Sequence, residues 1–132
     1  MPSFADTGEE TLQLVRKDPR TWQRIESETT AKISFHRQRG DFSCESHHLE
    51  CSQRYALIQH DESSPRGRGY IIAVATSSDD GTIKLMGNWQ RWHGKIWLVI
   101  ADDVRGHAGD TTIDQLIHWQ PSRYLFENKP LL

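Results

Sequence analysis

The alternation of apolar and polar side chains is clearest just after residue 30. Ala31, Ile33 and Phe35 alternate with polar neighbours, and this period of two is typical of a β-strand with one buried face. Apolar runs at 42–49 and 54–60 indicate two further strands. We therefore predict that the first half of the chain is dominated by β-structure.

The stretch 70–102 has the clearest organisation in the second half. Two turn signals, Asp-Asp-Gly at 79–81 and His93-Gly94, divide it into three β-rich runs. His93-Gly94 is a candidate for the turn of a two-residue hairpin, whose two central residues both need positive φ. We predict a three-stranded antiparallel meander over this stretch.

Helical spacing occurs near the start of the chain. Leu12 and Val15 lie three residues apart, which predicts a first short helix. Asp18-Pro19 matches an N-cap followed by proline at the first helical position, and this predicts a second helix. The segment 20–26 of that second helix also fits an edge strand.

A third helix is predicted near the end of the chain. Asp110 can cap a helix at 111–119, which Pro121 would end, and 124–126 is a candidate for a last strand. Together these elements predict an α+β fold for a single globular domain, 1–132, with an antiparallel β-sheet of about six or seven strands, short N-terminal helices and the helix near 111–119.

Composition and charge limit the possible classes of function. The chain of 132 residues is 36% hydrophobic and 26% charged, with a net charge of −2, so it lacks the basic excess typical of nucleic-acid-binding proteins. The longest apolar stretches, 70–76 and 96–101, are too short to cross a bilayer. Two cysteines and the absence of a secretory-signal pattern predict a cytoplasmic protein without a membrane role.

Two cysteines and two histidines form a grouping that suggests a zinc site. Cys44, His47, His48 and Cys51 could supply four ligands for tetrahedral zinc, although their spacing matches no familiar zinc finger. Alternatively, a turn at the two histidines would make the cysteines cross-strand neighbours. Adjacent side chains on a strand also point to opposite faces, which opposes the binding of one zinc ion by both His47 and His48. We predict no cofactor and keep zinc as the alternative.

Aromatic and basic residues alternate around the predicted second turn. Trp92 lies beside that turn, where burial is usually incomplete, and aromatic and arginine side chains are enriched at protein interfaces. Tryptophans are also natural core residues in a chain with few aliphatic side chains. The predicted partner-binding residues are Trp89, Arg91, Trp92, His93, Lys95, Arg66 and Arg68.

A catalytic alternative involves a histidine and two aspartates. His107 lies in a glycine-containing loop that follows Asp102 and Asp103. A hydrolase or nuclease, with or without a metal, would need these groups around one cleft. Aspartates at a strand end are also ordinary turn residues.

No nucleophile elbow, P-loop, dinucleotide fingerprint or CxxC motif is present in the sequence. We therefore predict a non-enzymatic interaction module that binds and modulates a macromolecular partner, most plausibly a protein, as small inhibitors, immunity proteins and adaptors do. The alternatives are the hydrolase or nuclease and a nucleic-acid-binding module. The last of these requires one shared face for Trp92, Arg91, Lys95 and the arginines at 37, 39, 66 and 68.

Overall fold

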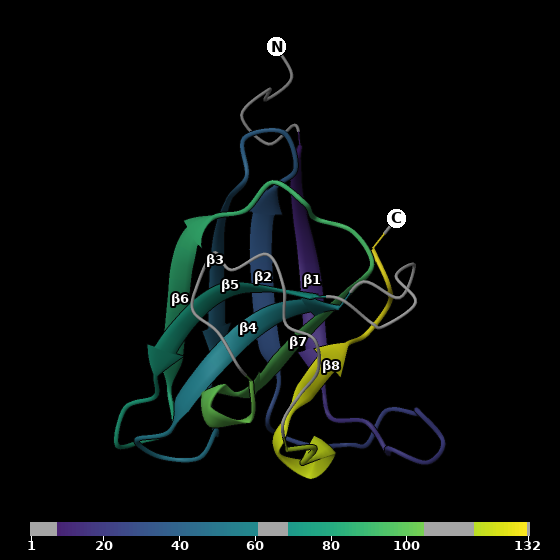
Figure 1. Cartoon of the computed structure of the whole chain (residues 1–132), viewed down its shortest axis with the longest axis vertical. Helices are drawn as coiled ribbons and strands as arrows, with labels where there is room; N and C mark the ends of the chain where they lie inside the picture. The colour runs from purple at the N-terminus through teal and green to yellow at the C-terminus, as the bar shows by residue number, and fades with distance from the viewer. Residues whose placement is uncertain (1–7, 61–68, 105–117, 132) are drawn as a thin grey trace.

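The computed structural model of the chain describes residues 8–60, 69–104 and 118–131 (Figure 1). Nearly all regular structure in these residues is antiparallel β-sheet. The strands are β1 (Glu9–Val15), β2 (Ala31–His36), β3 (Asp41–Ser46), β4 (Arg54–His60), β5 (Gly69–Thr76), β6 (Ile83–Asn88), β7 (Lys95–Ile100) and β8 (Leu125–Glu127). Two single turns of 3₁₀ helix, η2 (Ala101–Asp103) and η3 (Pro121–Arg123), complete the regular elements of the described chain.

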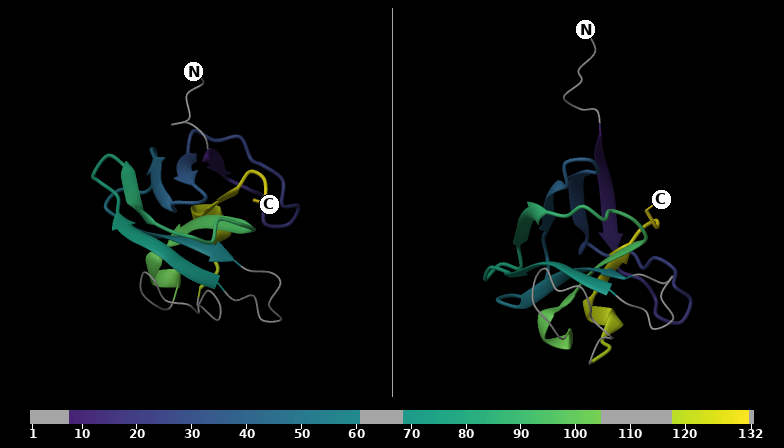
Figure 2. Two further views of the ribbon diagram at one scale, coloured as in Figure 1. Left: turned by 90° about the horizontal axis from the view of Figure 1, so that it is seen from above. Right: turned by 45° about the horizontal axis from the view of Figure 1, so that its top comes forward.

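The eight strands form one sheet in the order β5-β4-β7-β8-β1-β2-β3-β6. In Figure 1, β4, β5 and β7 cross in front of β1, β2 and β3 at a steep angle, and Figure 2 shows the two halves facing a common interior. The sheet is therefore strongly curled and barrel-like. The strands at its two ends, β5 and β6, approach each other near the turn that joins them but do not pair.

Side chains that face the interior align in rows across neighbouring strands. One such row runs from Leu12 through Ile33 and Cys44 to Leu85, and all four side chains are buried. This alignment follows from the strand period of two, which places every second residue on the same face. The predicted antiparallel sheet is confirmed, and its buried face gives the molecule its core.

The first predicted helix is wrong, because its residues form β1. Leu12 and Leu14 are buried whereas Thr11 and Gln13 are exposed, which is the period of a strand. The three-residue spacing of Leu12 and Val15 does not reflect a helix, because Val15 is buried at the point where β1 pairs with β8 opposite Phe126. Pairing with β2 from Glu9 to Leu14, and with β8 at the end of β1, supplies the backbone hydrogen bonds that a helix would have made internally.

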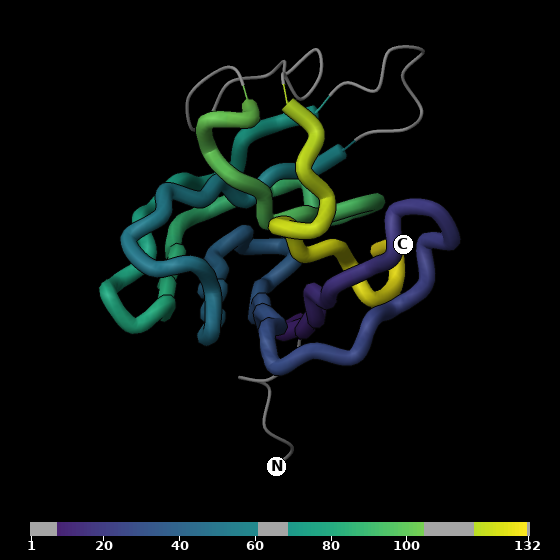
Figure 3. The backbone as a smooth tube through the Cα atoms, turned by 90° about the horizontal axis from the view of Figure 1, so that it is seen from below, coloured from purple at the N-terminus to yellow at the C-terminus, as the bar shows by residue number. Residues whose placement is uncertain are grey.

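The second predicted helix is also wrong. The connection 16–30 is irregular and loops outward beside β8 (Figure 3). The amide of Trp22 donates to the carbonyl of Asp18 at 2.7 Å, but Trp22 has a φ of 63°, which ends any helical turn. The indole instead packs on Phe126, with ring centroids 4.7 Å apart. Tertiary packing of one large side chain thus replaces the local helical preference.

The third predicted helix, at 111–119, lies largely outside the described residues, and 118–120 are not helical. The class α+β is therefore corrected to an all-β fold for the described part of the chain, with eight strands in place of six or seven.

The meander over 70–102 is wrong in its pairing, although β5, β6 and β7 lie at the predicted places. β5 pairs with β4, β6 pairs with β3, and β7 lies between β4 and β8. At the Asp-Asp-Gly turn, Gly81 has a φ of 81°, and its carbonyl accepts a hydrogen bond from the amide of Leu49 at 3.0 Å. A Cβ on Gly81 would lie 2.4 Å from the carbonyl oxygen of Leu49. The turn therefore packs against the β3–β4 connection and directs its two strands to opposite ends of the sheet.

Candidate functional site

Trp92, predicted to lie near an accessible tip, is a core residue. Its side chain is 1% exposed, and its indole stacks on Phe35 with centroids 4.4 Å apart and meets Phe42 edge-on at 5.4 Å. The connection between β6 and β7 therefore does not form the predicted hairpin at His93-Gly94. It crosses one end of the curled sheet and inserts Trp92 into the interior.

Three successive carbonyls of this connection are held by side chains from elsewhere in the fold. The amide nitrogen of Gln59, a fully buried residue of β4, donates to the carbonyls of Arg91 and His93. The guanidinium of Arg37 donates to the carbonyl of Trp92. The backbone on either side of the buried indole is consequently fixed by the core.

The fixed connection presents a group of three side chains that we call the aromatic–arginine cluster: Tyr70, Trp89 and Arg91. The rings of Tyr70 and Trp89 lie 5.5 Å apart, and both residues are half-buried. Arg91 is exposed, its Cζ lies 4.8 Å from the centroid of the Tyr70 ring, and its Nη1 donates to the Tyr70 hydroxyl at 2.6 Å. Two of the predicted partner-binding residues, Trp89 and Arg91, therefore lie together.

The other predicted partner-binding residues are distributed differently. His93 is exposed on the same connection. Lys95, in contrast, places its Nζ 5.5 Å from the centroid of the Trp22 ring. Arg66 and Arg68 lie outside the described residues. The structure thus brings only part of the predicted set to one place.

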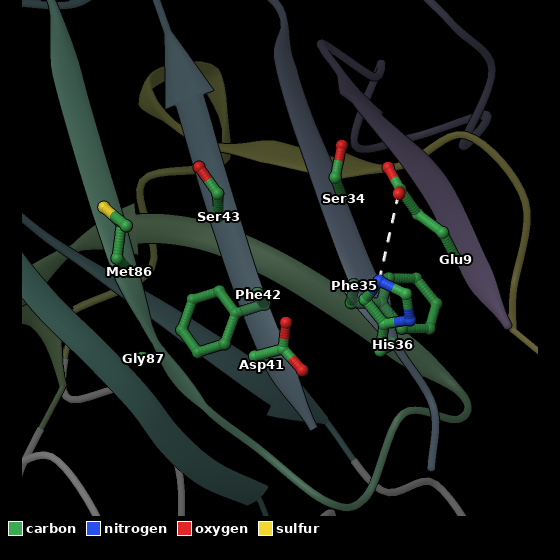
Figure 4. Close-up of a pocket in the computed structure, with 9 residues that line it drawn as sticks. All are labelled: Glu9, Ser34, Phe35, His36, Asp41, Phe42, Ser43, Met86 and Gly87. Carbon is green, nitrogen blue, oxygen red and sulfur yellow. Dashed lines mark ion pairs between the residues drawn. The ribbon is translucent and has the colours of Figure 1, made fainter. Parts of the chain in front are cut away.

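A groove of about 580 Å³ lies on the outward face of β1, β2, β3 and β6 (Figure 4). Its depth comes from short side chains: Ser34 and Ser43 project outward between longer neighbours, and Gly87 has no side chain. A Cβ on Gly87 would lie 3.3 Å from the ring of Phe42, which is buried and forms part of the apolar floor of the groove. Met86, which is 66% exposed, stands beside the groove on β6.

One wall of the groove is ionic. The Nε2 of His36 lies 3.8 Å from a carboxylate oxygen of Glu9 (Figure 4). On the other side of the histidine, Asp41 accepts hydrogen bonds from Arg39, which hold the pKa of Asp41 below its usual range. Both carboxylates therefore already have basic neighbours, and the groove combines a polar wall with an apolar floor.

The four candidate zinc ligands do not converge. Cys44 is fully buried in the core, and burial raises the pKa of its thiol to about 12, which opposes the thiolate that zinc requires. Cys51 is exposed, and His47 bonds to Thr82 at 3.3 Å. No group of three or more potential metal ligands occurs within residues 8–60, 69–104 and 118–131. The predicted turn at His47-His48 is wrong as well, because β3 ends before it and pairs with β6.

The candidate catalytic set is only partly described, since His107 lies outside the described residues. Asp102 is exposed, whereas Asp103 is buried and accepts hydrogen bonds from Gln120 at 2.9 and 3.0 Å and from the Tyr124 hydroxyl. These bonds tie η2 to the segment around η3. The Asp103 carboxylate thus has a structural role in joining two distant parts of the chain.

Tyr70 of the aromatic–arginine cluster and Met86 of the groove were not among the predicted functional residues. Tyr70 is the second residue of β5 and meets the β6–β7 connection through the curl of the sheet, which the sequence does not reveal. Met86 could have been identified from the sequence. Ile83 and Leu85 mark the buried face of β6, and Met86 is then an apolar side chain on the opposite, outward face.

Comparison of the chain with protein-family models, curated proteins and solved structures found no match. No helix in the described part of the chain has the length and apolar character needed to span a membrane.

Proposed function

We propose that the chain is a non-enzymatic interaction module that binds a protein partner through the aromatic–arginine cluster and modulates that partner. The observation that carries this proposal is the exposed Arg91, stacked and hydrogen-bonded on Tyr70 beside Trp89. Tryptophan, tyrosine and arginine are the three residue types most enriched among interface residues that contribute strongly to binding.

Arg91 has capacity for a partner group. Its Nη1 is engaged by Tyr70, and no carboxylate of a described residue lies within ion-pair distance of its guanidinium. A guanidinium held in place by an aromatic ring favours bidentate binding of a carboxylate. The half-buried rings of Tyr70 and Trp89 offer apolar area next to it. We therefore infer a partner segment that carries an Asp or Glu beside a large apolar side chain.

The fold reduces the entropic cost of this binding. The backbone of Arg91 is fixed by Gln59, and the next residue, Trp92, is locked in the core. A binding residue whose conformation is already ordered loses less freedom on association. This preorganisation supports a recognition role for the β6–β7 connection.

A protein partner is favoured over nucleic acid by the state of the other arginines. Arg37 forms two hydrogen bonds with Glu10, and Arg39 is paired with Asp41. Neighbouring carboxylates weaken attraction for phosphates. We also propose that the protein is cytoplasmic. Cys44 and Cys51 form no disulfide, as is usual for cysteines in a reducing compartment.

Selection from a random-peptide display library, with the wild-type chain as bait, tests the proposal. We expect enriched peptides to contain an acidic residue next to a large apolar one. Arg91→Glu is expected to weaken their binding at least about tenfold, measured by fluorescence anisotropy, because it opposes two negative charges.

Arg54→Glu is the matched control, since Arg54 is also exposed but lies away from the cluster on β4. It should leave binding unchanged, and both variants should unfold at the wild-type temperature. Equal binding by the Arg91 and Arg54 variants, or no enrichment of peptides at all, would refute the proposed site.

A further inference from the structure

The strand β6 ends the sheet, and no other described strand pairs with its outer edge. It pairs with β3 alone and lies at the outer margin of the molecule in Figure 1. Its pairing with β3 is continuous, without a bulge, and its sequence Ile-Lys-Leu-Met-Gly-Asn contains no proline. Bulges, prolines and charged side chains are the usual devices that prevent an edge strand from pairing with another chain, and of these β6 carries only Lys84, which is already paired with Glu45.

The backbone groups at this edge can be assigned from the hydrogen-bond pattern. The amide of Trp89 donates to the carbonyl of Gly40 at 2.8 Å, which marks these two residues as a hydrogen-bonded pair. Hydrogen-bonded and non-bonded pairs alternate along an antiparallel ladder. The N–H and C=O groups of Lys84, Met86 and Asn88 therefore point away from β3, toward the free edge. No backbone hydrogen bond from another described residue reaches them.

The outward face of the same residues is self-complementary. Met86 is the most exposed large apolar side chain of the strand, at 66%. Lys84 lies 3.4 Å from Glu45 at one end of β6, and Asn88 is opposite Asp41 at the other end. When two such strands run antiparallel, the Lys84–Glu45 pair of one copy comes beside Asn88 and the Arg39–Asp41 pair of the other, so both ends bring groups of opposite charge to the contact.

We propose that this chain forms a symmetric homodimer in which β6 pairs antiparallel with β6 of a second copy, with the two-fold axis at Met86. In this register Met86 lies opposite Met86 of the second copy. Lys84 lies opposite Asn88 of the second copy and next to its Asp41. The alternative register centred on Lys84 would place two like charges opposite each other, which is unfavourable in a cross-strand pair.

The dimer does not depend on the proposed partner-binding function, because no residue of the aromatic–arginine cluster belongs to β6. Pairing at the edge also leaves the outward face open. The groove of one copy then continues into the groove of the other across the two-fold axis, as the isologous contact of a two-fold dimer requires.

Sedimentation velocity over a concentration series measures the predicted association. The wild-type chain should shift from monomer to dimer with increasing concentration, and Met86→Leu should do the same. Met86→Pro removes an amide hydrogen from the free edge without removing a bond to β3, so it should stay monomeric. Met86→Lys should also stay monomeric, because it places like charges on the two-fold axis. Since residue 86 is exposed, this variant should fold, and it tests the dimer even where the proline variant does not fold.

Disulfide trapping tests the register in a Cys51→Ser background, which removes the exposed natural thiol. Directly opposed residues of a hydrogen-bonded pair have Cα atoms about 5.5 Å apart, within the range of a disulfide. Met86→Cys should cross-link under mild oxidation, whereas Lys84→Cys should not. A wild-type chain that remains monomeric throughout the series, or efficient cross-linking at residue 84 in place of 86, would overturn the proposal.

Discussion

Glu127 is a carboxylate that the fold holds away from water. It is 1% exposed, no described residue donates a hydrogen bond of ordinary geometry to its oxygens, and the Nζ of Lys17 lies 3.6 Å away. Burial raises the pKa of Glu127 above its ordinary value of 4.5, against the opposing attraction of Lys17 and Lys95. The folded state therefore holds this proton more tightly than the unfolded chain does.

This difference predicts the direction of a pH effect. Because the folded pKa is raised, the stabilising contribution of protonated Glu127 is complete below pH 4.5 and is lost as the pH rises through the folded pKa. Glu127→Gln does not titrate, so we expect it to match the wild type in acid and to be more stable at neutral pH. Urea unfolding at a series of pH values measures the two curves. Curves that stay parallel would show that the two lysines compensate fully for burial.

Trp92 was predicted to lie near an accessible turn but is buried, because its position depends on residues distant in the sequence. Its neighbours are polar and it precedes a plausible turn, so the local pattern indicated an exposed ring. Its burial depends on Phe35 and Phe42, which come from β2 and β3. Only the alternative, that tryptophans serve as core residues in a chain with few aliphatics, anticipated this outcome.

At the scale of single elements, β1 offers a direct test of strand against helix. Leu14 is fully buried and Gln13, its immediate neighbour, is exposed. Leu14→Ala should lower the free energy of unfolding by about 2–5 kcal/mol, because it leaves a cavity in the core. Gln13→Ala should change it by no more than about 0.5 kcal/mol. Chemical denaturation of both variants measures these values, and equal losses would contradict the alternation.

Element positions were more predictable than their pairing. The strand at 31–36 was predicted because its period of two is a local property of the sequence. The partners of β5, β6 and β7 were not, since each pairs with a strand other than its neighbour in the predicted meander. For the same reason the cluster was only half predicted: Trp89 and Arg91 are close in sequence, but Tyr70 joins them through the fold.

At the scale of the whole molecule, the candidate site depends on residues from several strands. Tyr70 comes from β5, and the connection that carries Arg91 is held by Gln59 of β4 and by Arg37, which follows β2. The recognition surface is therefore coupled to the closure of one end of the sheet by Trp92. A substitution in the core at this end of the sheet should therefore weaken partner binding although no exposed residue is changed.

Gln59→Leu tests this coupling. Leucine fills a similar volume but cannot donate, so the carbonyls of Arg91 and His93 lose their side-chain partner. We expect a loss of about 1–3 kcal/mol in stability, because the part-buried carbonyl of His93 loses its partner and that of Arg91 keeps only the amide of His93. Hydrogen exchange of amides at 89–94 should accelerate while the amides of β2 and β3 stay protected, since local opening need not involve the whole sheet. Peptides selected on the wild type should bind this variant more weakly although every residue of the cluster is intact. Unchanged exchange at 89–94 would instead mean that Trp92 alone orders the connection, and the hydrogen bonds of Gln59 would then have no part in shaping the site.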